Sequence, residues 1–292
     1  MCVATNFNTF CDDLKISSDK RSTISSRYDS ICTRLNKDFW NMDTIHGGRY
    51  VGSYGRNTAN GRVSDIDMIF EMPSNLKNTY DNYNGNGQSA FLQSVKNSLA
   101  KTYPTTHLKG NGQIVEITFA DGISFEVLPA FKNSDDSYTF ADSTSGGSWK
   151  NTNPIPEINA INNGDSLTNN NLKRLCKMAR SWKGYCSVPL KGLLIDTLAY
   201  RFLIDYAHKN QSYLYYDFIS RDFFKYLQEQ KSDQTVWYAV GSLQNIYNFE
   251  NFRYKATVAY NKSLEAIQLE TDNKSWSAKQ KWIEIYGNRF PS

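Results

Sequence analysis

Apolar side chains recur at helical intervals through residues 8–43, with one break near Ser17. After this region, runs rich in β-branched and aromatic residues predict strands. The dipeptide Asp121-Gly122 between two such runs is a strong hairpin signal. We expect Pro129 to end the second run. The predicted strands span 45–51, 66–70, 113–119 and 123–128.

The other segments are predicted as loops or helices. Asn, Tyr and Gly dominate residues 75–88, which predicts a loop, and apolar spacing predicts a helix over 91–99. Residues 132–165 are rich in Ser, Asn, Asp, Gly and Pro, so we expect an irregular connection. Beyond Asn169 the pattern is helical to the end. The predicted helices span 169–184, 190–208, 214–229, 234–248, 250–270 and 275–286.

This order of elements predicts an α+β protein with two lobes. Residues 1–165 would form a lobe with the N-terminal helices and a mixed β-sheet, and residues 166–292 a helical lobe. A chain of 292 residues is long enough for two lobes of this size. We expect an active site in the cleft between them.

Composition excludes some classes of protein. Hydrophobic residues make up 40% and charged residues 21%, which is typical of a soluble globular protein. A mean hydropathy of −0.58 and the lack of a long uncharged apolar run argue against a membrane span. The net charge of +4 does not indicate a nucleic-acid partner, although it is sufficient for a basic site that binds triphosphates.

The cysteines indicate a reducing compartment. They are odd in number and lack the paired spacing of metal sites, so we expect reduced thiols in a cytoplasm. They are Cys2, Cys11, Cys32, Cys176 and Cys186.

The segment GSYGRNTANGRVSDIDMIFE, residues 52–71, carries the candidate chemistry. Asp65 and Asp67 begin a strand, so both side chains point to one face, about 6.5–7 Å apart along the backbone. Paired carboxylates are hard ligands for Mg²⁺ or Mn²⁺, although a polar strand start or a turn cap is the alternative. Gly52 and Ser53 are expected to open a short helix over 53–58, whose first amides can hold phosphate.

A third carboxylate is needed, because two-metal phosphoryl transfer requires ligands that bridge two cations about 3.5–4 Å apart. Glu126 is the main candidate, since it is an acid inside an otherwise apolar strand. The alternative is a solvent-facing residue of an amphipathic strand, which Ser124 on the same face supports. Glu116 on the preceding strand is a weaker rival.

Four further residues could contact substrate. Arg56 could meet phosphate or be a solvated charge, and Trp149 could stack on a base or anchor a loop on the core. Lys177 and Arg180 follow Lys173 on one face of a predicted helix, and a solvated face is the default interpretation of that basic stripe.

These residues resemble a known superfamily. Gly52-Ser53, Asp65-x-Asp67 and the acidic strand at Glu126 are similar to the polymerase-β-like nucleotidyltransferases. The fuller pattern GSYGRNTA, SDIDM, FEVLPAF and GGSWKNTNP resembles the bacterial cGAS/DncV-like nucleotidyltransferases (CD-NTases, SMODS-type) over about residues 45–291.

The resemblance implies an enzyme that joins nucleoside triphosphates (ATP, GTP or pyrimidine NTPs) into a cyclic di- or trinucleotide, without a nucleic-acid template. A separate effector protein would sense this second messenger in anti-phage (CBASS-type) defence. It also implies that Asp65, Asp67 and Glu126 bind two Mg²⁺ or Mn²⁺ ions, that Gly52 and Ser53 hold phosphate, and that Lys177 touches the donor triphosphate. The family often has Asp at the position of Glu126.

Two rival functions remain open. Another template-independent nucleotidyltransferase would label RNA or protein, and a catalytically inactive nucleotide sensor would use the same fold without turnover. The complete acidic trio argues against the inactive sensor.

Overall fold

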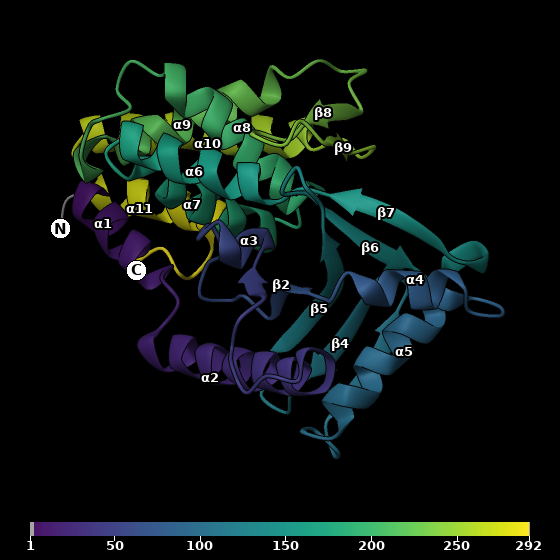
Figure 1. Ribbon diagram of the computed structural model, residues 1–292. Coiled ribbons are helices and arrows are strands. Elements are labelled where there is room, and N and C mark those ends of the chain that lie inside the picture. The colour runs from purple at the N-terminus through teal and green to yellow at the C-terminus, as the bar shows by residue number, and fades with distance from the viewer. Residues whose placement is uncertain (1–2, 292) are drawn as a thin grey trace. The chain divides into compact units, whose positions relative to one another are not determined.

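The protein is described by a computed structural model over residues 3–291 (Figure 1). It divides into two compact units, a sheet unit and a helical unit. The sheet unit comprises residues 17–55 and 62–155, and the helical unit comprises the described part of residues 1–16, 56–61 and 156–292.

This division differs from the predicted boundary at residue 165, because packing rather than chain order defines the units. Phe7 and Phe10 of α1 (Val3–Asp13) are fully buried, with ring centroids 5.0 and 5.4 Å from that of Phe290. The first helix therefore belongs to the same core as the C-terminal segment.

The sheet unit is built on a mixed sheet, which confirms the predicted α+β class. Within residues 3–291 this sheet has seven strands in the order β1-β2-β5-β4-β3, with β6 joined to β5 and β7 joined to β6. β2 and β5 are parallel, and every other pair is antiparallel. The strands are β1 (Gly48–Tyr50), β2 (Asp65–Glu71), β3 (His107–Asn111), β4 (Ile114–Thr118), β5 (Ser124–Lys132), β6 (Tyr138–Asp142) and β7 (Ser148–Thr152).

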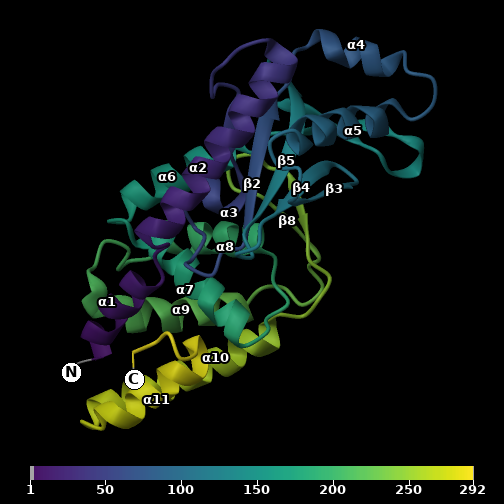
Figure 2. The same ribbon diagram turned by 90° about the horizontal axis from the view of Figure 1, so that it is seen from below.

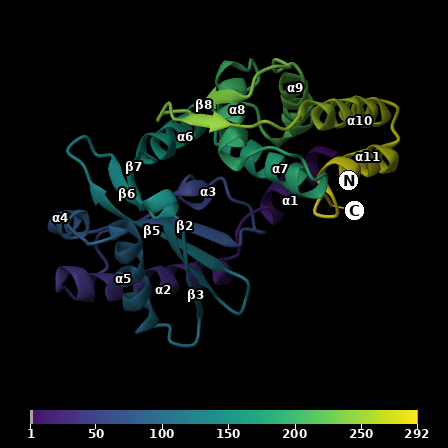
Figure 3. The same cartoon turned by 90° about the vertical axis from the view of Figure 1, so that its right-hand side faces the viewer.

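Helices cover one face of this sheet. Met68 of β2 and Val127 of β5 are fully buried in one cluster with Ile31 of α2 and Phe91 of α5. Figure 3 shows α2 and α5 on the same side of β2 and β5. The unit's helices are α2 (Ser18–Leu35), the π-helical η1 (Asn36–Trp40), α3 (Gly52–Gly55), α4 (Asn75–Asp81), α5 (Gly87–Ala100) and the 3₁₀ turn η2 (Thr144–Gly146).

At two places in the chain, neighbouring residues alone were enough to predict the local structure correctly. The predicted break near Ser17 is confirmed, because its hydroxyl caps α2 by accepting the amide of Lys20 at 3.3 Å. The predicted hairpin around Asp121-Gly122 is also confirmed, since β4 and β5 pair with Val115 opposite Val127.

The prediction that Pro129 ends its strand is wrong, and β5 continues to Lys132. Proline lacks an amide proton, so a strand tolerates it only where no ladder bond is required. The ladder from β4 reaches Val127, and the ladder from β6 begins at Ala130. Pro129 lies between the two ladders.

Two predicted irregular segments contain regular structure. Residues 75–81 form α4, because Tyr80 packs against Phe91 with ring centroids 5.1 Å apart and Lys77 pairs with Asp81 at 2.7 Å. Residues 132–165 contain β6, β7 and most of α6. β6 forms because it pairs with the end of β5, where Phe140 lies opposite Ala130. These stabilising contacts depend on particular pairs of side chains and strands, which composition does not reveal.

The helical unit packs its elements around one apolar core. Figure 2 shows α10 and α11 side by side, as their packing requires. In addition to α1 the elements are α6 (Ile155–Leu167), α7 (Asn171–Tyr185), α8 (Gly192–Asp205), the 3₁₀ turn η3 (Tyr213–Tyr215), α9 (Tyr216–Gln228), β8 (Val236–Tyr238), β9 (Asn245–Tyr247), α10 (Arg253–Thr271) and α11 (Ser275–Tyr286).

The predicted helix over 234–248 is wrong, because these residues form the β8–β9 hairpin. Trp237 and Ile246 pair across it and are both buried. Gly241 in the connection has a φ of 85°, and a Cβ there would lie 2.1 Å from the carbonyl oxygen of Pro156. The tight turn therefore requires glycine.

Two expectations from composition can be compared with the structure. Among residues 3–291, no helix is long and apolar enough to cross a membrane. Of the cysteines in that range, Cys11, Cys32, Cys176 and Cys186 are free thiols, and Cys2 lies outside the described residues.

Asp217 gives a test of pH-dependent stability. Burial raises its pKa to about 6, although the amide of Phe218 donates to its carboxylate at 2.8 Å. Between an unfolded pKa of about 3.9 and this value the folded state keeps the proton more strongly, so stability falls as pH rises. We expect Asp217→Asn to remove this loss and to stabilise the protein by about 1–3 kcal/mol near pH 8 but little near pH 4.

Urea unfolding at the two pH values measures the effect. Asp233→Asn, on an exposed loop, is the matched control and should change stability by less than about 0.5 kcal/mol at both. An Asp217→Asn gain of the same size at both pH values would contradict the assignment.

Candidate active site

The three predicted carboxylates lie on the sheet face opposite α2 and α5. In the parallel register of β2 and β5, Asp67 pairs with Glu126, and Asp65 precedes Asp67 by two positions. Aligned residues of neighbouring strands point to the same face, and so do residues two apart on one strand. Asp65 is exposed, whereas Asp67 and Glu126 are half-buried. The structure therefore brings the trio to one face.

Glu116 joins this group as a fourth carboxylate, directly opposite Glu126 in the β4–β5 ladder. Burial, the negative charges of Asp67, Asp65 and Glu116, and a hydrogen bond with Asp67 together raise the pKa of Glu126 to about 7. Such a shift is expected where several carboxylates share one site, and a bound cation would reverse it.

The donor set fits Mg²⁺ or Mn²⁺ by its chemistry, since carboxylate oxygens are the ligands these ions prefer. Among residues 3–291, however, no three His, Cys, Asp or Glu side chains are gathered as a finished metal site.

The Gly52 turn lies directly against Asp67. The amide of Val51 donates to the carbonyl oxygen of Asp67 at 3.0 Å. Gly52 has a φ of 60°, and a Cβ at this position would lie 1.8 Å from Oδ2 of Asp67. Only glycine allows both this backbone conformation and this close approach. The turn and the acid pair, separate motifs in the sequence, form one site.

The helix after this turn is shorter than predicted. α3 ends at Gly55 rather than at residue 58, because Asn57 adopts a left-handed φ of 56° that no α-helix continues. Ser53 remains in its first turn, where the predicted phosphate contact would be made.

The close approach at Gly52 predicts a functional defect in Gly52→Ala. The new methyl group must displace the Asp67 carboxylate, and the left-handed backbone costs about 1–2 kcal/mol for alanine. We expect a loss of about tenfold or more in nucleotidyl transfer, measured as pyrophosphate release, beyond any effect of stability.

Gly122→Ala is the matched control for this variant. Gly122 has a φ of 81°, but a Cβ there would meet nothing within 4 Å. This variant should lose similar stability and keep its activity. Equal activity in the two variants would mean that the Asp67 contact has no role in turnover.

Arg56 and Arg180 lie in a buried ionic cluster of the helical unit, which contradicts the solvated-charge interpretation of Arg56. Asp196, completely buried, accepts from Arg56 Nε at 2.9 Å and from Arg180 Nη1 at 2.7 Å. Thr58 donates to Asp196 at 2.8 Å, and Glu157 accepts from Arg56 Nη1 at 3.2 Å. Arg56 is 5% exposed, so it is not a solvated charge, and carboxylates already occupy its guanidinium.

Asp196 itself was not singled out from the sequence. The available signal was an acid within the apolar run of residues 192–204. A charge in such a position is seldom buried without partners, but the sequence does not identify them.

Lys177 is half-buried on α7, and its Nζ lies 3.4 Å from Oδ1 of Asn57. Burial lowers its pKa, which Asp165 partly opposes. The opposite face of α7 carries an apolar stripe that is fully packed: Leu172, Leu175, Cys176, Ala179 and Trp182 are all buried. Contact between Lys177 and a triphosphate stays a prediction.

Trp149 packs on the sheet unit. Its ring centroid lies 5.5 Å from that of Phe131 and 5.9 Å from that of Phe91, and its Nε1 donates to Asp81 at 2.6 Å. These contacts match the anchoring interpretation, because they fix β7 against α4 and α5.

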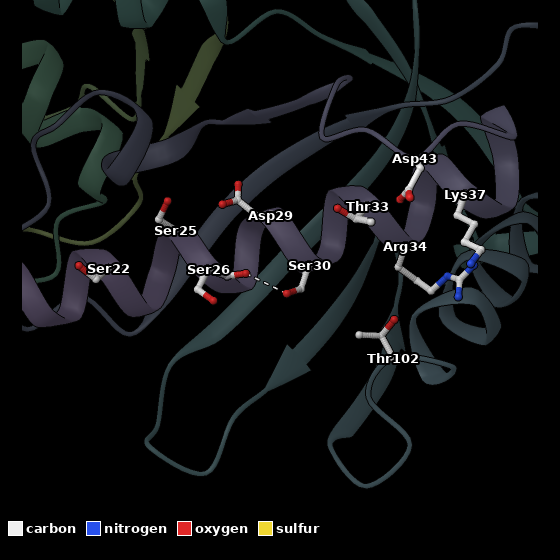
Figure 4. A pocket seen from close by; sticks show the side chains of 10 residues that line it. All are labelled: Ser22, Ser25, Ser26, Asp29, Ser30, Thr33, Arg34, Lys37, Asp43 and Thr102. Atoms are coloured by element: carbon white, nitrogen blue, oxygen red, sulfur yellow. Dashed lines mark hydrogen bonds between the residues drawn. The ribbon is translucent and has the colours of Figure 1, made fainter.

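A large cavity lies away from the acids. It measures about 760 Å³ and runs along the outer side of α2, where hydroxyl side chains from Ser22 to Thr33 line it (Figure 4). Asp29 and Asp43 offset Arg34 and Lys37, so its charge is mixed. Because α2 covers the opposite face of the sheet, this cavity is not part of the acid site.

Comparisons with known proteins agree with this arrangement. The SMODS family (Second Messenger Oligonucleotide or Dinucleotide Synthetase domain) matches residues 1–164. No curated protein matches the chain closely enough to be called a relative.

Several solved structures share the fold at low sequence identity. The E. coli MS115-1 CdnC:HORMA-deltaN complex has a TM-score of 0.73 at 14% identity, covering 99% of this chain and 98% of that chain. The Bradyrhizobium diazoefficiens CD-NTase CdnG in complex with GTP has a TM-score of 0.66 at 8% identity, covering 99% and 96%.

A third similar structure is Vibrio cholerae DncV cyclic AMP-GMP synthase with its linear intermediate 5′ pppA(3′,5′)pG, at a TM-score of 0.66 and 14% identity, covering 84% of this chain and 69% of that chain. The family match covers more than half of the sequence, and the fold agrees over nearly all of it. This chain therefore belongs to the SMODS family, the Second Messenger Oligonucleotide or Dinucleotide Synthetase domain.

Proposed function

We propose that this protein joins nucleoside triphosphates into a cyclic di- or trinucleotide and releases pyrophosphate. One observation carries the proposal: Asp67 pairs with Glu126 on the face that also carries Asp65, and the Gly52 turn lies directly against Asp67. The family match supports a second-messenger product. We propose that a separate effector protein senses it in anti-phage defence.

In this proposal Asp65, Asp67 and Glu126 hold two divalent ions, Mg²⁺ or Mn²⁺. When bound, these ions would supply positive charge that favours an ionised attacking hydroxyl and offsets the charge of the leaving pyrophosphate. Glu126 is preferred to Glu116 because it is the direct strand neighbour of Asp67.

The other residues act on the nucleotides themselves. Gly52 and Ser53 would hold phosphate oxygens through backbone amides and the serine hydroxyl, which keeps the donor α-phosphate in line with the acceptor hydroxyl. Lys177 would offset triphosphate charge. For Arg56 and Arg180 we propose a structural role instead, since Asp196 accepts from both guanidinium groups and Glu157 accepts from that of Arg56.

The direct test is incubation with four labelled nucleoside triphosphates and Mg²⁺ or Mn²⁺. We expect pyrophosphate release and a phosphatase-resistant product whose mass equals that of a cyclic di- or trinucleotide. Label transferred to RNA or protein would instead support another template-independent nucleotidyltransferase. Nucleotide binding without any metal-dependent pyrophosphate release would support the inactive sensor.

A further inference from the structure

A second cavity, of about 340 Å³, opens beside Glu126 within the sheet unit. We call it the Gln113 pocket. Its volume lies within the range typical of small-molecule sites. The turn between β3 and β4 and the end of β6 form its walls. The lining residues used below are Asn111, Gln113, Ile114, Glu126, Asp142 and Thr144.

We propose that the Gln113 pocket binds the base of one substrate nucleotide and that Gln113 selects a base carrying an exocyclic amine. This inference rests on the proposed function, because the pocket shares Glu126 with the acid site. A group held there lies next to the carboxylates, whereas the cavity along α2 does not.

The lining does not favour the charged part of a nucleotide. Of the described residues that line the pocket, none is Lys or Arg, whereas Glu126 and Asp142 are acids. The lining therefore offers no cationic side chain to a triphosphate. A neutral base needs none, and it finds an apolar wall in Ile114 and polar partners in the Gln113 amide and the Thr144 hydroxyl. Bases are recognised by this combination of apolar and hydrogen-bonding contacts.

Asp142 fixes the orientation of the Gln113 amide. The Asp142 side chain is 3% exposed and accepts from Gln113 Nε2 at 3.2 Å and from Thr144 Oγ1 at 2.6 Å, and it also pairs with Lys150. Contacts with Lys150 and Thr144 hold the pKa of Asp142 far below its ordinary range, so this carboxylate only accepts hydrogen bonds.

The nitrogen of the Gln113 amide must therefore face Asp142, which leaves its oxygen as an acceptor for the ligand. An acceptor in a fixed position favours a donor on the base. The exocyclic amines of adenine and cytosine are such donors, whereas the carbonyl oxygens of hypoxanthine and uracil are not. The turn that carries Gln113 is also held in place, because the carbonyl oxygen of Gly112 accepts the amide of Ser143 at 2.8 Å.

The test compares ATP with ITP and CTP with UTP in wild type, Gln113→Leu and Asp142→Asn. Pyrophosphate release and equilibrium binding in metal-free buffer are both measured. We expect wild type to prefer the amino-bearing nucleotide of at least one pair by about tenfold, and both variants to reduce that preference toward equality. Gln93→Leu, at an exposed glutamine of α5 outside the pocket, should keep the wild-type preference.

The outcomes distinguish a failure of the proposed function from a failure of the proposed role of Gln113. A wild type that binds nucleotides but releases no pyrophosphate overturns the proposed function. An active wild type without any amino preference overturns the role of Gln113, and so does an unchanged preference in both variants. If Gln113→Leu does not fold, Asp142→Asn decides alone, because it removes the charge that orients the amide and keeps the size of the side chain.

Discussion

Asp67→Ala is expected to abolish metal-dependent pyrophosphate release, with a loss of about 10³-fold or more. Asp67 lies between Glu126 and the Gly52 turn, so it is the carboxylate common to the proposed metal and phosphate sites. A ligand of a catalytic ion contributes several kcal/mol of transition-state stabilisation, and each 1.4 kcal/mol corresponds to tenfold in rate. The measurement is the steady-state rate with Mg²⁺, together with a thermal unfolding curve that shows the variant to be folded.

Glu71→Ala provides the matched control. Glu71 belongs to the same strand and the same face as Asp67, but it lies four residues further along, about 13 Å away. Removing its carboxylate should leave the rate within about twofold of wild type. If the two variants lose activity equally, the acidic face as a whole matters and Asp67 has no special position. If Asp67→Ala keeps its activity, the proposed chemistry is wrong.

The face shared by the acids was predictable because strand alternation is a local property. The run DIDMIFE places Asp65 and Asp67 on one side and Ile66, Met68 and Phe70 on the other. The three apolar side chains are fully buried, whereas on the acid face burial begins only at Ile69. For the same reason Glu126 was recognisable as an acid of an apolar strand. The choice between Glu126 and Glu116 was not predictable in this way. It depended on the pairing of β2 with β5, which places Asp67 beside Glu126 although the two are far apart in the sequence.

Partners far apart in the sequence account for the wrong interpretations. Arg56 and Asp196 are 140 positions apart, and nothing near Arg56 indicates a buried partner. Gln113 and Asp142 are 29 positions apart, and Asp142 falls within a segment whose composition predicts a loop. Where such long-range contacts stabilise a segment, the local propensity of its residues predicts its structure only weakly.

The buried cluster around Asp196 suggests the largest effect on stability. Burial by itself would raise the pKa of Asp196, but Arg180 and Arg56 outweigh it and hold the pKa below its ordinary range. The carboxylate is therefore charged at neutral pH and completely buried. Removing one member of such a group leaves the others buried without compensation.

Asp196→Ala is therefore expected to lower the free energy of unfolding by about 3–5 kcal/mol, measured by urea denaturation. Glu157 still pairs with Arg56 in this variant, whereas Arg180 retains only the carbonyl oxygen of Gly192 at 3.1 Å. The main cost should thus come from Arg180. The double variant Asp196→Ala/Arg180→Ala should then lose less than the sum of the two single variants, since it removes the unpaired charge together with its partner.

A surface pair shows how much of this effect depends on burial. Glu284 pairs with Lys262 at 2.8 Å, but the two side chains are 44% and 30% exposed. Water already solvates both groups, so Glu284→Ala should cost less than about 1 kcal/mol. If Asp196→Ala cost no more than this, or if the double variant lost the full sum, the guanidinium groups would not depend on Asp196. The segment Arg56–Gly61 would then have to be held in the helical unit by its other contacts, such as the bond from the Gly61 amide to the carbonyl oxygen of Leu14 at 2.9 Å.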